Sequence, residues 1–327
     1  MATSVQVVRA SNAQFASSGR TGAVCVFAGA TSGIGARTLE RMLSMFEEAT
    51  FYITGRSPER FAEQLKVLEA RKNPKCTIVF IETDVSLISG IDKASEVILA
   101  AESHVDYLCM SMGGVPVNGV EYTVEGLDAC FAISYYSRMR LLANLLPLLR
   151  RSEGGARVLS VLNGGKEKFI KEDDIGLEKN WSLYSIVKHT TLLTSLALDY
   201  LAAQRENANI TFVHNYPGLV KSDNFRHLNP PPSSSVLWGA WLAVVKVLVS
   251  VIRFFAGMSP EEAGERQAYH LTSDKYGPGS WRVHNSSEIK PPTKALAHYQ
   301  NAGWPAKVWD FTHNIWETAL KIGSSAT

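Results

Sequence analysis

The chain has 327 residues, of which 46% are hydrophobic and 20% charged, so it can bury the core of one large α/β domain. Its 33 basic and 31 acidic residues give a formal net charge of +2, which excludes a general electrostatic field for nucleic acid or an anionic membrane. The four cysteines are far apart and the first 20 residues hold no continuous apolar stretch, which favours a cytoplasmic protein with free thiols and no metal site.

Short apolar runs alternate with longer segments of helical period, which predicts βαβ units in a doubly wound parallel sheet of Rossmann type with about seven strands. The predicted strands are 23–29, 50–54, 77–82, 106–112, 157–162 and 210–215, with an edge strand at 281–285. The predicted helices are 33–46, 122–150 and 182–205. We expect a single domain over 1–327, with a core at 20–225, a substrate lid region at 226–275 and a C-terminal extension at 276–327.

A glycine-rich segment, AGATSGIGA, follows the first predicted strand and opens the first predicted helix. Gly29 permits a tight turn, Gly33 lets the backbone approach a pyrophosphate, and Gly35 allows the helix to pack closely on the sheet. Free N–H groups at the start of the helix would face the anion. The alternative is a purely structural glycine turn, which would not need a strand before it and a helix after it. The predicted dinucleotide contacts are Gly29, Thr31, Ser32, Gly33, Ile34 and Gly35.

The second predicted strand ends in YITGRSPER, where Gly55 is followed by Arg56. Enzymes that use NAD place an acid here for the ribose hydroxyls, whereas an arginine can pair with the 2′-phosphate of NADP. We therefore expect NADPH/NADP+ as the cofactor, held by Arg56 with help from Arg37. The alternative is a solvated surface arginine.

Tyr184 and Lys188 stand four residues apart in the segment YSIVK, near the start of the predicted helix 182–205. This spacing places both side chains on one helical face. A phenol is a weak acid–base group at neutral pH, and a neighbouring ammonium favours its ionised form, so Lys188 is expected to tune the acidity of Tyr184. The alternative is a surface pair one helical turn apart.

Together these motifs resemble the short-chain dehydrogenase/reductase family over roughly residues 20–225. The glycine spacing is similar to the family's TGxxxGxG, with Ala28 in place of the threonine, and YSIVK is similar to its YxxxK. The resemblance implies that Tyr184 is the proton donor and that Lys188 also holds the nicotinamide ribose. The segment MSPEEAGERQAYHL and the Trp-rich end resemble fungal members that act on polyketide or other specialised metabolites.

Further segments resemble the family less evenly, and a plain loop is the alternative for each. TDV is similar to the family's adenine contact, which implies roles for Asp84 and Val85. In CMSMGG, only Gly113 and Gly114 remain of the family's Asn-Asn-Ala-Gly. YPGLVKS is similar to the Pro-Gly segment beside the nicotinamide, which implies contacts from Pro217, Gly218, Val220 and Ser222.

Two positions that carry chemistry in the family hold other residues here. The catalytic serine position at the tip of the fifth strand falls on Asn163, in RVLSVLNGG. An amide can donate a hydrogen bond to a substrate oxygen as a hydroxyl does, although Asn-Gly also forms turns. The position of the active-site asparagine falls on Ser134, which we expect to support a proton relay or to cap a kink in the helix.

An apolar segment at 236–257 is long enough to span a membrane but carries Lys246 and Arg253, which make spanning costly. These two charges are seven residues apart on one helical face, so the rest of the segment could pack inward. We expect a mobile lid over an apolar substrate pocket. A contact in a homo-oligomer and peripheral membrane attachment are its rivals.

These observations predict an NADPH-dependent reductase that transfers a hydride to a carbonyl of a hydrophobic, polyketide-type metabolite. Tyr184 would give the proton, with Lys188, Asn163 and Ser134 assisting. The first alternative is an isomerase, cyclase or dehydratase that keeps the cofactor without redox turnover, because Ser134 and Asn163 depart from the family pattern. The second is a silent NADP-binding scaffold, which would have no use for the Tyr184–Lys188 pair.

Overall fold

The computed structural model describes residues 2–114, 119–221 and 257–325. Within them, eight strands form one sheet in the order β3-β2-β1-β4-β5-β6-β7-β8. The strands are β1 (Ala23–Ala28), β2 (Ala49–Gly55), β3 (Thr77–Glu82), β4 (Tyr107–Met110), β5 (Arg157–Val161), β6 (Thr211–Asn215), β7 (Gly279–Val283) and β8 (Ile289–Lys290). The pairs from β3 to β7 are parallel, and β8 is antiparallel to β7. The predicted doubly wound sheet is confirmed, and its order reverses between β1 and β4, where such folds bind ligands.

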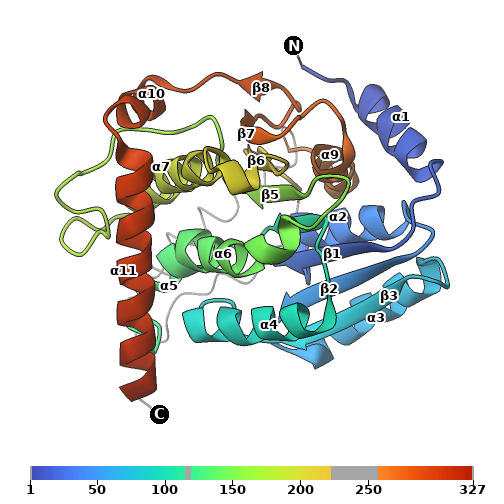
Figure 1. Cartoon of the computed structure of the whole chain (residues 1–327), viewed down its shortest axis with the longest axis horizontal. Helices are drawn as coiled ribbons and strands as arrows, with labels where there is room; N and C mark the ends of the chain where they lie inside the picture. Colours follow the sequence, from blue (N-terminus) through green and yellow to red (C-terminus); the bar gives the residue numbers. More distant parts are fainter. Residues whose placement is uncertain (1, 115–118, 222–256, 326–327) are drawn as a thin grey trace, which may run out of the picture.

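Helices cover both faces of this sheet (Figure 1). One face carries α1 (Val5–Ala16), α2 (Gly33–Leu43), α3 (Pro58–Arg71) and α9 (Pro260–Thr272). The other carries α4 (Ile88–Ala101), α5 (Ala129–Phe131), a π-helix (Ala132–Tyr136), α6 (Ser137–Leu149), α7 (Leu183–Ala202) and α11 (Trp304–Ser325). The other helices in the described ranges are a 3₁₀ turn (Arg205–Asn207) and α10 (Lys294–Asn301).

The central strand β1 shows how the sequence builds two cores. All six of its residues are buried, which is typical of a parallel strand covered on both faces. Val24 and Val26 pack in the core beneath α4, α6 and α7, whereas Cys25 and Phe27 pack in the core beneath α1, α2 and α9. The side chains alternate between the two faces, so the continuous apolar run fills both cores at once.

The predicted helix at 122–150 begins later than expected. Gly126 adopts a positive φ of 76°, and Tyr122 forms an isolated bridge with Asp128, so this stretch is a turn. Asp128 then caps the helix, since its Oδ1 accepts from the Phe131 N–H at 2.7 Å. The predicted start was wrong because the apolar spacing continued through a glycine turn that ends on an N-cap.

The predicted edge strand at 281–285 is β7, but it is not the edge of the described sheet. The chain turns at Ser287, whose φ is 57°, and returns as β8 alongside β7. A strand of two residues is too short to leave a period-2 pattern, which explains why β8 was not predicted.

After β7 and β8, the C-terminal extension continues as α10 and α11, and α11 runs along the end of the layer that contains α4, α6 and α7 (Figure 1). Its buried side chains recur at helical spacing and include Val308, Thr312, Trp316 and Ala319. The Trp-rich end of the chain is therefore an amphipathic helix that completes one core.

Among residues 2–114, 119–221 and 257–325, no helix has the length and apolar character to cross a membrane. The segment 236–257, predicted as a lid, lies almost entirely outside the described residues.

Acidification should destabilise the fold through two fully buried histidines. Burial, aided by nearby cations, lowers the pKa of His270 to about 3 and that of His214 well below its usual range. Below pH about 6.5 the histidines bind protons in the unfolded chain but not in the folded chain. The free energy of unfolding is therefore at its full value above that pH and decreases as pH falls. We expect urea unfolding to show up to about 2.7 kcal/mol lost per pH unit between about pH 6 and 5.

The variant His270→Gln should show a smaller pH dependence, because one of the histidines whose pKa is lowered by burial no longer titrates. A free energy of unfolding that stays constant from pH 7 to 5 in the unmodified protein would contradict the assignment.

Candidate active site at the carboxyl edge of the sheet

The glycine-rich turn lies between β1 and α2, and its conformation requires the predicted glycines. Gly29 has a φ of 83°, and a Cβ there would collide with the backbone of Met112 at the end of β4. A Cβ at Gly35 would collide with the Gly29 carbonyl oxygen. Gly33 opens α2 with a φ of 60°. The turn therefore has a backbone surface bare of side chains, which suits close approach by a phosphate.

This turn and the N-terminus of α2 together form a surface that we call the glycine cradle. Ser32 is the N-cap, but its side chain makes no capping hydrogen bond to the helix. The first N–H groups of a helix have no partner within the helix, and together they carry a partial positive charge. Thr31, Ser32 and Ile34 thus lie where the sequence placed them, around an N-terminus that can bind an anion.

The ends of β2 and β3 lie next to this turn. A Cβ at Gly55 would lie 2.9 Å from Cγ2 of Thr31, so the exposed Arg56 follows directly beside the cradle. The Thr83 N–H donates to the Gly55 carbonyl at 2.8 Å, which brings the loop with Asp84 and Val85 to the same edge. Asp84 itself accepts from the N–H and the hydroxyl of Ser86 at 2.9 and 2.8 Å.

Arg37 is placed differently from Arg56. Its guanidinium donates to Glu40 on the same helix at 2.8 Å, and its backbone lies against Gly264 of α9. It lines a cavity of about 260 Å³ together with residues of α1, α3 and α9. Its assistance in cofactor binding stays a prediction, with Glu40 as a competing partner.

Arg138 of α6 holds together the ends of β4 and β5 beneath the predicted site. It is 1% exposed, and burial lowers its pKa to about 10, so it remains charged at neutral pH. Its guanidinium donates to the backbone carbonyls of Met110, Met112, Ile133 and Val161 and to the hydroxyl of Ser160. These hydrogen bonds offset the cost of burying the charge, so the guanidinium needs no carboxylate as an ion-pair partner. They also fix the chain just before Gly113 and Gly114.

Ser134 lies in the π-helix, where the hydrogen-bond pattern of the α5–α6 segment is interrupted. Its side chain is buried, and its hydroxyl lies 3.9 Å from the Cys130 sulfur. The helix is therefore irregular at this position, and π-helices are found often at functional sites. The role of Ser134, in a proton relay or as the cap of a kink, stays a prediction. Because the π-helix packs against α7, Ser134 stands on the helix next to the one that carries Tyr184.

The C-terminal helix α11 supports the π-helix directly. The indole N–H of Trp316 donates to the Tyr136 carbonyl at 3.1 Å, and the Tyr135 hydroxyl lies 2.6 Å from the Thr312 hydroxyl. All four side chains are buried. Trp316 thereby joins α11 to the junction between the π-helix and α6.

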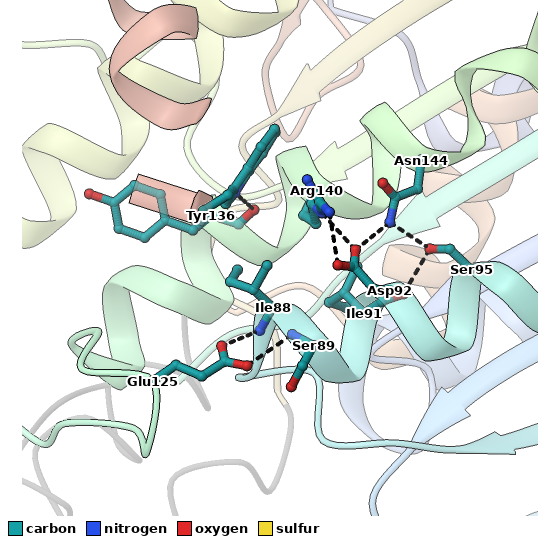
Figure 2. A network of polar contacts seen from close by, with 10 residues as sticks. Ile88, Ser89, Ile91, Asp92, Ser95, Glu125, Tyr136, Arg140 and Asn144 are labelled. Carbon is teal, nitrogen blue, oxygen red and sulfur yellow. Dashed lines mark hydrogen bonds and ion pairs between the residues drawn. The ribbon is translucent and has the colours of Figure 1, made fainter. Parts of the chain in front are cut away.

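Figure 2 shows how the same region is tied to α4. Asp92 of α4 accepts from Arg140 at 2.6 and 2.8 Å and from Asn144 at 2.7 Å, both on α6. Glu125, which is 1% exposed, accepts from the first two backbone N–H groups of α4. A carboxylate at a helix N-terminus is favourable, so Glu125 fixes the loop before α5 onto α4.

Asn163 follows β5 at the carboxyl edge, as predicted. Its N–H donates to Nε2 of His214 at 3.2 Å, and its carbonyl accepts from the Lys166 N–H at 3.0 Å, which closes a turn. Gly164 is required next, because a Cβ there would collide with the His214 carbonyl oxygen. The turn and the site interpretations of Asn163 are therefore compatible: the backbone turns, and the partly exposed side chain remains available.

Tyr184 and Lys188 lie in the first two turns of α7, whose N-cap Ser182 accepts from the Ser185 N–H at 3.0 Å. The Lys188 ammonium lies 4.9 Å from the centre of the Tyr184 ring and 3.5 Å from the Phe169 carbonyl oxygen. Tyr184 is 66% exposed. The predicted pair is thus brought together at the N-terminal end of α7.

The Pro-Gly segment follows β6 at the same edge. Gly218 has a φ of 74°, and a Cβ there would press on the Asn285 side chain. Val220 forms a parallel bridge with Met258, which joins the segment after Pro217 to the start of the C-terminal region. Ser222 lies outside the described residues.

Comparison with known proteins agrees with this architecture. The family described as short chain dehydrogenase matches residues 23–232. An oxidoreductase from the fungus Emericella nidulans is 34% identical over 97% of this chain and 99% of its own length. A short-chain dehydrogenase/reductase from Stachybotrys chartarum is 30% identical over 90% of this chain and 84% of its own length.

Solved structures share the fold at lower identity. The L-sorbose reductase from Gluconobacter frateurii, in complex with NADPH and L-sorbose, is 19% identical with a TM-score of 0.56, covering 82% of this chain and 97% of its own. RhlG from Pseudomonas aeruginosa, in complex with NADP, is 19% identical with a TM-score of 0.56, covering 80% of this chain and 94% of its own. The predicted resemblance, fold and oxidoreductase class are thereby confirmed. The chain belongs to the short-chain dehydrogenase family.

Proposed function

We propose that this protein is an NADPH-dependent reductase that converts a carbonyl of a hydrophobic metabolite to an alcohol. The observation that carries the proposal is the Tyr184–Lys188 pair, with the ammonium 4.9 Å from the ring at the N-terminus of α7. A positioned proton donor with a cation beside it is the element that carbonyl reduction requires from the protein.

The residues of the glycine cradle fit a dinucleotide. The turn excludes side chains at Gly29 and Gly35, and the uncapped start of α2 can bind the pyrophosphate. Gly55 offers no acid to the ribose, and Arg56 is exposed next to it for the 2′-phosphate. Asp84 and Val85 would border the adenine, and Gly113, Gly114, Pro217, Gly218 and Val220 the rest of the cofactor.

Bound NADPH would supply the hydride to the carbonyl carbon. Tyr184 then donates its phenolic proton to the carbonyl oxygen, which becomes a hydroxyl. Lys188 stabilises the phenolate that remains and would also hold the ribose of the cofactor. Asn163 donates an amide hydrogen bond to the same oxygen and so stabilises the negative charge that develops on it. Ser134, on the neighbouring π-helix, would return a proton to Tyr184 through water.

An apolar substrate is supported by side chains at the same edge. In the described part of the chain, large hydrophobic residues are exposed on the segments after β4, β5 and β6 and on the first turns of α7. They are Val120, Tyr122, Val124, Phe169, Leu183, Val187 and Leu219. Exposed apolar side chains on the loops that follow the strands are typical of a site for a hydrophobic ligand.

The variant Arg56→Ala should weaken NADPH binding by about 10- to 100-fold and leave NADH binding nearly unchanged. A charge-assisted bond to the 2′-phosphate contributes roughly 1.5–3 kcal/mol, and NADH lacks that phosphate. Fluorescence titration of both cofactors measures the difference. Arg71→Ala, which removes an exposed arginine at the far end of α3, is the matched control. Equal affinities for NADPH and NADH in the unmodified protein would refute the assignment.

The proposed reaction is tested by mixing the purified protein with NADPH and a panel of aromatic and polyketide ketones while following the cofactor absorbance. The expected result is NADPH consumption that depends on the ketone and favours apolar members of the panel. If no ketone caused NADPH consumption although NADPH bound, carbonyl reduction would be the wrong reaction.

A further inference from the structure

A chain of buried side chains lies directly behind Asn163. The His214 Nδ1 lies 2.8 Å from the Ser195 hydroxyl, and that hydroxyl donates to Oε1 of Glu167 at 2.7 Å. The same Glu167 oxygen accepts from the Gly165 N–H at 2.9 Å. Ser195 and His214 are inaccessible to solvent and Glu167 is 3% exposed. The chain thus begins and ends on the turn that carries Asn163.

The directions of these hydrogen bonds follow from one observation. The backbone N–H of Asn163 can only donate, so Nε2 of His214 must accept and carry no proton. The proton of the neutral ring is therefore on Nδ1, from where it donates to Ser195. Ser195 in turn donates to the Glu167 carboxylate, which accepts. Each member fixes the orientation of the next, and the last holds the Gly165 N–H.

Burial and the charges around His214 keep the ring neutral. Arg138 of α6 and Arg282 of β7 oppose its protonation electrostatically, and Glu167 is linked to it through Ser195 of α7. Burial and the two arginines lower the pKa of His214. The hydrogen bond from Asn163 to Nε2 is therefore available throughout the neutral pH range.

We propose that Glu167, Ser195 and His214 are positioning residues for the carbonyl reduction and hold the backbone of Asn163 at the strand tip. This inference rests on the proposed function. It holds that these three hydrogen-bonded residues place the Asn163 amide against the reacting oxygen. A displacement of about 1 Å at such a group can lower turnover about 100-fold. Three buried polar side chains behind a two-glycine turn supply the rigidity that the turn lacks.

The test compares Ser195→Ala with Thr194→Val in the full-length protein. Ser195→Ala removes the acceptor for His214 Nδ1 and the donor to Glu167. Thr194 is also buried on α7, but its hydroxyl donates only to the Thr190 carbonyl of its own helix, so Thr194→Val is the matched control. Nitrogen NMR of the histidine rings reports the protonated nitrogen of His214, and hydrogen exchange reports the Asn163 N–H.

We expect Ser195→Ala to shift the His214 ring signals and to speed exchange at the Asn163 N–H by about 3- to 10-fold, as the loss of one hydrogen bond implies. Its kcat for ketone reduction should fall by about 10- to 100-fold with unchanged NADPH affinity. Thr194→Val should change none of these. The inference is overturned if Asn163 exchange is the same in both variants, or if it is faster in Ser195→Ala without any fall in kcat.

The failure of the proposed function would look different. It would be seen in the unmodified protein, as an absence of ketone reduction, whereas failure of the positioning role is seen only in the difference between the two variants.

Discussion

Replacing Tyr184 with phenylalanine is expected to lower kcat for carbonyl reduction by about 10²–10⁴-fold, the usual contribution of a positioned general acid. The change removes one oxygen from a ring that is 66% exposed, so the fold should be unaffected. The aromatic ring that faces the Lys188 ammonium remains, which should leave NADPH affinity nearly unchanged. Steady-state kinetics with the ketone identified in the substrate panel, together with a cofactor titration, measures both effects.

Tyr200→Phe is the matched control for this variant. Tyr200 lies near the other end of the same helix, where its ring stacks on Trp309 of α11. It should retain full kcat. If Tyr184→Phe also kept full activity toward the substrate, Tyr184 could not be the proton donor, and the proposed mechanism would be wrong.

Asn163→Ala should lower kcat by about 10²–10³-fold, the usual effect of removing one donor to a developing oxyanion. NADPH affinity should change little, because the glycine cradle and Arg56 belong to other strands. The backbone N–H at this position persists in the variant and can still donate to His214. The loss would therefore report the side-chain amide rather than the turn.

Asn163→Ser is the conservative counterpart and should retain much more activity than Asn163→Ala. A serine hydroxyl can donate the same hydrogen bond, and serine is the family's usual residue at this position. Equal losses in the two variants would show that the amide does not act as a donor to the substrate oxygen. Full activity in Asn163→Ala would remove Asn163 from the mechanism altogether.

Much of the fold could be predicted because its signals are local. The central parallel strands are buried on both faces, so strands such as Ala23–Ala28 and Thr211–Asn215 stand out as apolar runs. The glycine cradle was predictable for a related reason, since a positive φ at Gly29 and the contact at Gly35 exclude other residues. Tyr184 and Lys188 were predictable because a fixed spacing on one helix is enough to bring them together.

The support of the site could not be predicted in the same way, because it depends on contacts between distant segments. Trp316 reaches the Tyr136 carbonyl across 180 positions of sequence, and Arg138 joins two strand ends. A charged residue is expected at the surface, so Arg138 was not considered. Its signal was its place in the apolar stripe of α6, one turn before Leu141 and Leu142.

The π-helix around Ser134 illustrates a second limit. A shift from the α-helical to the π-helical hydrogen-bond pattern over five residues leaves the apolar spacing almost unchanged. The sequence therefore indicated a helix that carries Ser134 and suggested a kink, but not its form. The structure relates the π-helix to the C-terminal helix, because the indole N–H of Trp316 donates to the carbonyl of Tyr136 at the end of the π-helix.

The most direct test of the reductase assignment is to supply NADPH that carries deuterium at the transferable position and to analyse the product by mass spectrometry. We expect one deuterium on the alcohol carbon for each NADPH oxidised, with the proton on oxygen coming from the solvent through Tyr184. Product that forms without label and without NADPH oxidation, while the cofactor is still required, would contradict it and would indicate a non-redox isomerase, cyclase or dehydratase.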